Sequence, residues 1–268
     1  MSELAPFGGG LARREARKIL AILGLTASLA AFVSACGGVG AVTELNHLRQ
    51  VAKGCPDSPV AAFVALDARG SLRGRQLTVA RLAAIENLAT KVAVCGGGRL
   101  RVVAFGPSPA ATATVFDDGL HPAGATENAR LIRVPGIVSK AVGEVEQGLP
   151  VAFRQLTRNG ADPVAQLAAA RDFGDELGPG TAVVVLIETS GLTRMTARLT
   201  KATAVKLARQ VSVPDLHGAT VTFAGLGRVG AGPPPSTTTI EALRAYFETV
   251  CRRTEARCRA VTEIAVGS

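Results

Sequence analysis

The 268-residue sequence is poor in aromatic side chains, with no Trp, one Tyr and nine Phe. Proteins that bind single-stranded nucleic acid stack bases on aromatic side chains, so we expect no nucleic-acid partner. Charged residues make up 19% of the chain and hydrophobic residues 47%. This balance excludes an intrinsically disordered chain, which needs few hydrophobic and many charged residues. The net charge is +9, but the basic residues form no block of like charges.

Several patterns that carry chemistry are also missing. No two cysteines are separated by two residues, and His47, His121 and His217 lie far apart in the sequence, so the spacing of a zinc site is absent. There is no G-x-S-x-G motif, and no set of Ser, His and Asp is marked by its spacing. Residues 225–230 match G-x-G-x-x-G, but the prolines at 233–235 prevent the helix that a dinucleotide site needs. We therefore expect neither a cofactor nor enzymatic activity.

The first 35 residues have the composition of a targeting segment. Four basic residues at positions 13, 14, 17 and 18 precede an uncharged run over residues 19–35. As a helix rising 1.5 Å per residue, this run would barely cross a hydrocarbon core of about 30 Å. Its length and basic flank are typical of a secretory signal peptide rather than of a stable membrane span.

The signal segment ends in Val-Ser-Ala-Cys at residues 33–36, which resembles the lipobox of bacterial lipoproteins. The resemblance implies that the chain is cleaved before Cys36 and that this cysteine carries a diacylglycerol thioether and an N-terminal acyl chain such as palmitate. The protein would then be anchored at the extracytoplasmic face of the cell membrane, since two or more acyl chains anchor stably. Export by the general or the twin-arginine route stays open. Residues 36–56 would form a tether with a short helical segment at 44–51.

The four remaining cysteines are expected to form two disulfides, because an exported protein meets an oxidising compartment. Cys55 and Cys95 each precede a predicted strand by five residues. If these strands are adjacent and parallel, equal offsets bring the two cysteines together, which predicts Cys55–Cys95. Cys251 and Cys258 are too far apart along a continuous helix to be bridged, so Cys251–Cys258 requires a helix that ends near Cys251.

Hydrophobic runs alternate with helical periodicities over residues 57–268. We predict strands at 60–66, 100–105, 112–116, 181–187, 219–224 and 258–264, the third being an antiparallel edge strand. Helices are predicted near 82–92, 126–157 (broken at Pro135-Gly136 and at Pro150), 163–177, 204–210 and 240–250, the last opened by a capping box at 238–241. This alternation predicts an α/β domain: a doubly wound, mostly parallel six-stranded sheet with helices on both faces.

The loop after the first strand reads Asp-Ala-Arg-Gly-Ser over residues 67–71 and resembles the Asp-x-Ser-x-Ser motif of von Willebrand factor A (vWA) domains. In that family the motif belongs to a metal-ion-dependent adhesion site. The family's second loop carries Thr-Asp, where this chain has Ala161-Asp162, and its third carries Thr-Asp-Gly, where this chain has Thr189-Ser190-Gly191. In order and number of elements, the resemblance covers residues 58–266.

The departures from the family motif change the expected chemistry. A cation such as Mg²⁺ prefers about six oxygen ligands, whereas the guanidinium of Arg69 offers only donors. Ala161 and Ser190 remove a hydroxyl and a carboxylate. We therefore predict a degenerate, metal-free site in which Arg69 neutralises Asp67 and Asp162. Weak binding of Mg²⁺ or Mn²⁺ by Asp67, Ser71 and Asp162 stays open.

Together these patterns predict a membrane-tethered lipoprotein whose vWA-like domain binds a protein partner at the cell envelope. The partner would meet the loops that carry the site, whose residues are Asp67, Arg69, Ser71, Asp162, Thr189 and Ser190. Two alternatives stay open: a solute-binding lipoprotein of a transporter, which needs two lobes, and a membrane-tethered hydrolase with Ser71 as nucleophile.

Overall fold

The computed structural model describes residues 37–69, 75–108, 110–156, 160–193, 196, 199–230 and 233–264, with the side chains of residues 37–42 and 75–77 left aside. Residues from Val39 onward belong to one compact unit. The signal segment, Cys36 and Ser71 lie outside the described residues. None of the described helices is long and apolar enough to span a bilayer.

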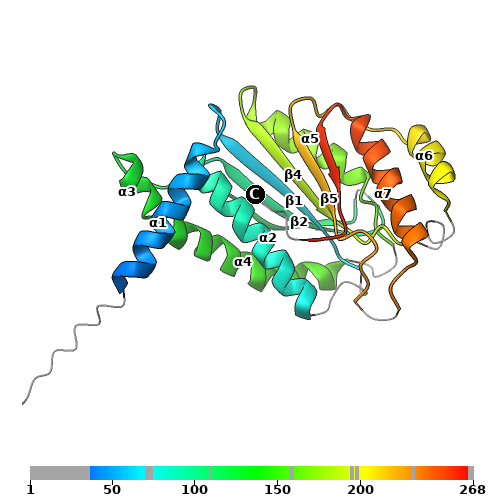
Figure 1. Ribbon diagram of the computed structural model, residues 1–268, viewed down its shortest axis with the longest axis horizontal. Coiled ribbons are helices and arrows are strands. Elements are labelled where there is room, and N and C mark those ends of the chain that lie inside the picture. The colour runs from blue at the N-terminus through cyan, green and yellow to red at the C-terminus, as the bar shows by residue number, and fades with distance from the viewer. Residues whose placement is uncertain are drawn as a thin grey trace, which may run out of the picture. The chain divides into compact units, whose positions relative to one another are not determined.

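A six-stranded sheet forms the centre of the domain (Figure 1). Its strands are β1 (Val60–Asp67), β2 (Arg99–Phe105), β3 (Thr112–Gly119), β4 (Ala182–Glu188), β5 (Thr220–Ala224) and β6 (Arg257–Ala260). They are arranged in the order β3-β2-β1-β4-β5-β6. All pairs are parallel except β2 with β3, so β3 is the predicted antiparallel edge strand. The predicted α/β fold class is confirmed.

Helices cover both faces of this sheet, as Figure 1 shows. One face packs on α2 (Arg75–Val94) and α4 (Val134–Gln155), and the other on α5 (Ala165–Leu177) and α7 (Thr237–Arg252). α6 (Lys201–Gln210) packs against α7. Because β1 lies between the two helical layers, all eight of its residues are buried. This explains why it reads as a continuous hydrophobic run rather than as an alternating one.

Helix α1 (Gly37–Lys53) is longer than the segment expected at 44–51. Its Leu48 is buried in the core on the α2 and α4 side. Arg49 donates to the side-chain oxygen of Asn128, with its Nη2 at 3.1 Å, and Asn128 belongs to the short helix α3 (Glu127–Leu131). The polypeptide before β1 therefore packs on the domain instead of hanging free as a tether.

Four details of the helices and strands differ from the sequence predictions. α4 begins just before Pro135, where proline is tolerated because the first helical N–H groups have no partner. Pro150 does not break α4 but lies within it, on the exposed side. α7 is capped by Ser236, whose hydroxyl accepts the N–H of Thr239 at 3.2 Å, so the predicted capping box at 238–241 is wrong. β6 ends at Ala260 rather than at residue 264.

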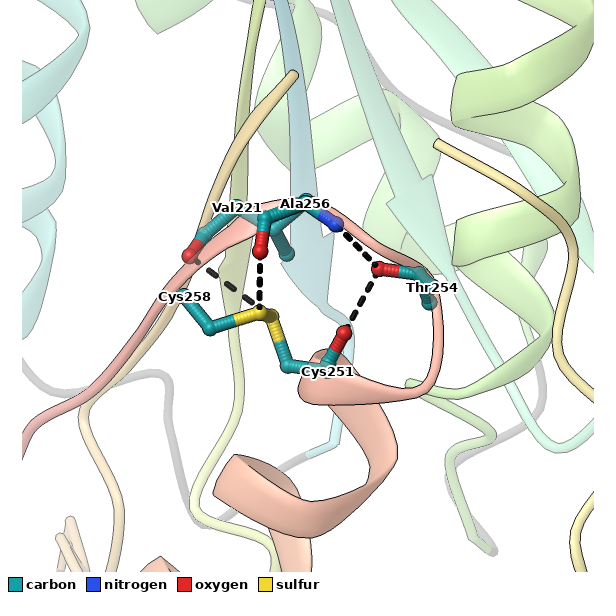
Figure 2. The surroundings of a disulfide bond; sticks show 5 residues. All are labelled: Val221, Cys251, Thr254, Ala256 and Cys258. Atoms are coloured by element: carbon teal, nitrogen blue, oxygen red, sulfur yellow. Dashed lines mark hydrogen bonds between the residues drawn. A yellow bond between two sulfur atoms is a disulfide. The ribbon is translucent and has the colours of Figure 1, made fainter. Parts of the chain in front are cut away.

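The structure contains both predicted disulfides. Cys55–Cys95 joins two positions whose Cα atoms lie 5.3 Å apart, just before β1 and β2. Cys251–Cys258 closes the turn between α7 and β6, with Cα atoms 5.7 Å apart (Figure 2). In this turn the hydroxyl of Thr254 donates to the carbonyl of Cys251 at 2.7 Å, which stabilises the reversal of the chain. α7 ends at Arg252, as the second bridge requires.

Candidate functional site

Two carboxylates lie side by side at the carboxyl end of the sheet. Asp67 is the last residue of β1 and Glu188 the last of β4, and the register pairs Leu66 with Glu188. Both residues are buried, with relative exposures of 0% and 1%. In doubly wound folds, ligands bind beyond the carboxyl ends of the strands, near the point where the strand order reverses. β1 and β4 flank that point here, so we call the loops beyond them the carboxyl edge.

Asp67 is held by Arg69, two residues further along the chain. The backbone N–H of Arg69 donates to Oδ1 at 3.0 Å, and its Nε lies 3.0 and 2.8 Å from Oδ1 and Oδ2. Nη2 also contacts Oδ2 in an ion pair. The hydroxyl of Thr189 donates to the same Oδ2 at 2.8 Å. The expected contact between Arg69 and Asp67 is therefore present, and both oxygens of the carboxylate have donors.

The remaining donors of Arg69 reach the loop after β4. Nη2 lies 3.1 Å from the hydroxyl oxygen of Thr189 and 2.9 Å from that of Ser190, and Nη1 donates to the carbonyl of Leu192. The hydroxyl oxygens of Thr189 and Ser190 also accept the N–H groups of Gly191 and Leu192, at 3.0 and 3.3 Å. The guanidinium thus joins the first and third loops of the predicted site.

Gly191 allows this third loop to approach α7. It has a φ of +63°, which L-residues with a side chain rarely adopt. A Cβ atom there would lie 2.7 Å from a ring carbon of Phe247. Glycine is therefore required at position 191 by both backbone conformation and packing.

Asp162 has a different role from the one predicted. Its Oδ1 accepts the backbone N–H groups of Val164 and Ala165, at 3.2 and 3.0 Å, so it caps the start of α5. Its own N–H donates to the carbonyl of Gly106 at 2.9 Å. Within the described ranges, the ion pairs of Arg69 include Asp67 but not Asp162. The prediction that Arg69 neutralises both carboxylates is therefore met for Asp67 only.

These residues do not fit a divalent cation. Arg69 places its donors between Asp67 and Ser190, where the resemblance expects the metal, and Ala161 supplies no side-chain oxygen. Among the residues that the structure describes, no cluster of three or more His, Cys, Asp or Glu side chains is arranged to hold a metal. Ser71, the other predicted oxygen ligand, belongs to the part of the chain that is not described.

Sequence reasoning missed a second ion pair at this edge. Arg81 of α2 and Glu188 are both almost fully buried, and Nε of Arg81 lies 2.7 and 2.8 Å from the two carboxylate oxygens. Nη2 of Arg81 lies 3.4 Å from the backbone carbonyl of Asp67, and its guanidinium lies 5.7 Å from the ring centre of Phe153. Burial raises the pKa of the Glu188 carboxyl, and the charge and hydrogen bonds of Arg81 oppose that rise. The available signal was a charged residue at the end of the most hydrophobic strand.

A cavity of about 310 Å³ opens beside Arg69, and we call it the edge cavity. Its lining includes Arg69, Asp162, Thr189 and Gly191. Leu199, Leu207, Val211, Tyr246 and Phe247 are among the apolar and aromatic residues that line the rest. The edge cavity is therefore mostly apolar, with a few polar groups near the Asp67–Arg69 pair, as binding sites commonly are.

Comparison with known proteins gives no family for this chain. No protein-family description and no curated protein matches it. Among solved structures, it is similar to proximal thread matrix protein 1 from the mussel byssus, with 14% sequence identity and a TM-score of 0.40. The match covers 78% of this chain and 45% of the other, so the chain spans less than half the length of that protein.

Proposed function

We propose that this protein is a membrane-tethered extracytoplasmic lipoprotein whose vWA-like domain binds a protein partner at its carboxyl edge without a divalent cation. The observation that supports this most is the Arg69 guanidinium, which lies against Asp67 and bonds to Thr189 and Ser190. A fixed positive charge there does electrostatically what a cation would do, so the loops can be ordered without one.

The lipid anchor at Cys36 is proposed from the lipobox resemblance at residues 33–36. The position of α1 is compatible with it. α1 contacts α3 through Arg49 and Asn128, and Figure 1 places both helices at the end of the sheet opposite the carboxyl edge.

The alternatives receive less support. A solute-binding lipoprotein would close two lobes on its ligand, and the described residues form one sheet with one layer of helices on each face. The hydrolase alternative needs an activated Ser71, for which the described part of the chain offers no observation. We therefore keep protein binding as the conclusion.

Crosslinking followed by affinity capture from native membranes tests this function with two matched variants. Leu207→Arg places a charge in the edge cavity, and Ile132→Arg places the same charge on an exposed apolar residue outside that cavity. We expect the first variant to capture at least tenfold less partner than the unmodified protein, and the second variant to capture the same amount. Both results should be the same with and without EDTA. Equal retention by both variants, or loss of the partner in EDTA, would contradict the proposal.

A further inference from the structure

A second cavity adjoins the edge cavity along α5. It has a volume of about 650 Å³, and we call it the helix cavity. The two cavities share four lining residues, Asp162, Val164, Val211 and Tyr246. The two cavities therefore lie next to each other and meet at these four residues, which we call the junction, and we call the two cavities together the groove.

Most of the groove on either side of this junction is apolar. Pro163, Leu199, Leu207 and Phe247 are among the residues that line the edge cavity, and Ala165, Ala168, Val213 and Pro214 line the helix cavity. Each cavity has room for a large apolar side chain. The groove can therefore take two apolar groups separated by the junction.

The charges along the groove leave Asp162 as the carboxylate at its centre. The cations at the two ends are already paired, Arg69 with Asp67, and Arg171 with Asp175 at 3.4 Å. Oδ1 of Asp162 accepts backbone N–H groups, and within the described ranges no arginine, lysine or histidine forms an ion pair with this residue. A cationic group entering the groove would meet, at the junction, a carboxylate that none of the described basic side chains pairs.

Tyr246 adds an aromatic ring to the lining of both cavities, beside Asp162. Burial and the nearby charge of Asp162 both raise the pKa of the Tyr246 phenol, so this hydroxyl stays neutral at physiological pH. An aromatic ring attracts a cation through its electron-rich face. Asp162 and Tyr246 together therefore favour a lysine or arginine side chain over a neutral or acidic one.

We infer that the groove binds an extended segment of the protein partner in which a lysine or arginine lies between two apolar residues. In an extended chain, alternate side chains point the same way and are spaced by about 6.6–6.8 Å, which predicts the pattern apolar-x-Lys/Arg-x-apolar. The cation would contact Asp162 and Tyr246, and the two apolar side chains would fill the two cavities. This inference rests on the proposed function, because it names the chemistry of the partner at the same surface.

Fluorescence anisotropy with labelled peptides tests the inference on the full chain in detergent. The peptides share the core Leu-Ser-X-Ser-Leu between Gly-Ser flanks, with X as Lys, Arg, Gln or Glu. The measurement is made at 0.15 M salt, where the Debye length of about 8 Å limits the effect of the protein's overall positive charge. We expect the Lys and Arg peptides to bind at least tenfold more tightly than the Gln and Glu peptides.

Two variants separate charge from structure. Asp162→Asn removes the charge but keeps an oxygen that can cap α5, and it should abolish the preference for Lys and Arg. Asp215→Asn is the matched control, because Asp215 also accepts a backbone N–H, from His217 at 2.8 Å, but lines neither cavity. It should leave the preference unchanged.

The outcomes distinguish this inference from the proposed function. A preference for Glu, no difference among the peptides, or a preference that survives Asp162→Asn would overturn the inference. Displacement of the Lys peptide by an equal concentration of n-butylamine would also overturn it, because the site would then select a small amine. Each of these results leaves the proposed function standing if capture from membranes is still lost in Leu207→Arg and retained in Ile132→Arg.

Discussion

Asp67 and Glu188 end two adjacent parallel strands, and each carboxylate is neutralised by a different arginine. Arg69 reaches Asp67 from the loop that follows it, and Arg81 reaches Glu188 from the next helix. Removing two charges from water is costly, so two unpaired carboxylates at this position would destabilise the sheet. The two arginines let both strands end in buried acids at the carboxyl edge.

The Asp67–Arg69 pair should stabilise the fold. Asp67 is fully buried and the Arg69 side chain is 11% exposed, so Arg69→Ala leaves a buried carboxylate without its cation. We expect the free energy of unfolding, measured by urea denaturation at pH 7, to fall by about 3 kcal/mol. Arg171→Ala is the control, because the Arg171–Asp175 pair is 55% and 69% exposed and should contribute little. Equal effects of the two substitutions would contradict this account.

Replacing three residues should convert the edge into a cation site. Arg69→Ser, Ala161→Thr and Ser190→Asp together remove the guanidinium and restore the hydroxyls and carboxylate that the vWA resemblance expects. We expect calorimetric titration with Mg²⁺ or Mn²⁺ to give binding to the triple variant and none to the unmodified protein, since hard cations need oxygen ligands. Asp67→Asn added to the triple variant should abolish binding. Tight binding by the unmodified protein would refute the metal-free interpretation.

The two disulfides should contribute unequally to stability. A disulfide lowers the entropy of the unfolded chain, and this loss of entropy, which stabilises the folded state, grows with the length of the closed loop. The cysteines of Cys55–Cys95 are 40 residues apart and those of Cys251–Cys258 seven. Replacing both cysteines of a pair by Ala should lower the free energy of unfolding by about 4 kcal/mol for the first pair and about 2.5 kcal/mol for the second. A larger loss from the second pair would argue against the entropic account.

Lipidation of Cys36 is a separate prediction. We expect mass spectrometry of the mature protein from bacterial membranes to find an N-terminal peptide that begins at Cys36 and carries the mass of acyl chains. Cys36→Ser should give protein without lipid, either uncleaved or released from the membrane. An unmodified N-terminus at another position would refute the lipoprotein proposal.

The fold could be predicted because its signals are local. The strands are hydrophobic runs bounded by polar or glycine-rich segments, and all eight residues of β1 are buried as such a run requires. The errors occurred where local patterns are ambiguous. Four consecutive hydroxyl residues at 236–239 can each cap a helix, and their pattern alone does not single out Ser236, which is the cap in the structure. Pro150 stays within α4 because it is exposed, so the carbonyl that loses its N–H partner can face water.

The candidate site could be predicted only where its residues are close in the sequence. Arg69 and Asp67 are two residues apart, so the motif itself suggested their pairing. Arg81 and Glu188 are 107 residues apart, and their contact depends on how α2 packs over β1 and β4. The capping role of Asp162 likewise depends on where α5 begins, which could be predicted only approximately from local patterns.

The buried Arg81–Glu188 pair predicts a pH dependence. Since burial raises the pKa of Glu188 in the folded state above its value in the unfolded chain, the folded state holds the proton more tightly. The stability that protonated Glu188 contributes is therefore fully present below the pKa of Glu188 in the unfolded chain. It is lost as the pH rises through the pKa of Glu188 in the folded state. Arg81 opposes the rise, so its removal should raise the folded pKa further and extend the loss to higher pH.

Arg81→Met should therefore destabilise the protein more at pH 8 than at pH 5. At pH 8 the substitution leaves a charged, buried carboxylate, for which we expect a loss of about 3–5 kcal/mol in the free energy of unfolding. At pH 5 part of this loss should be avoided, because Glu188 can take up a proton. Adding Glu188→Gln to Arg81→Met should remove most of the difference between the two pH values, since glutamine does not titrate. Urea denaturation of the three proteins at both pH values measures this, and an equal loss at pH 5 and pH 8 in Arg81→Met would show that Glu188 does not titrate in this range.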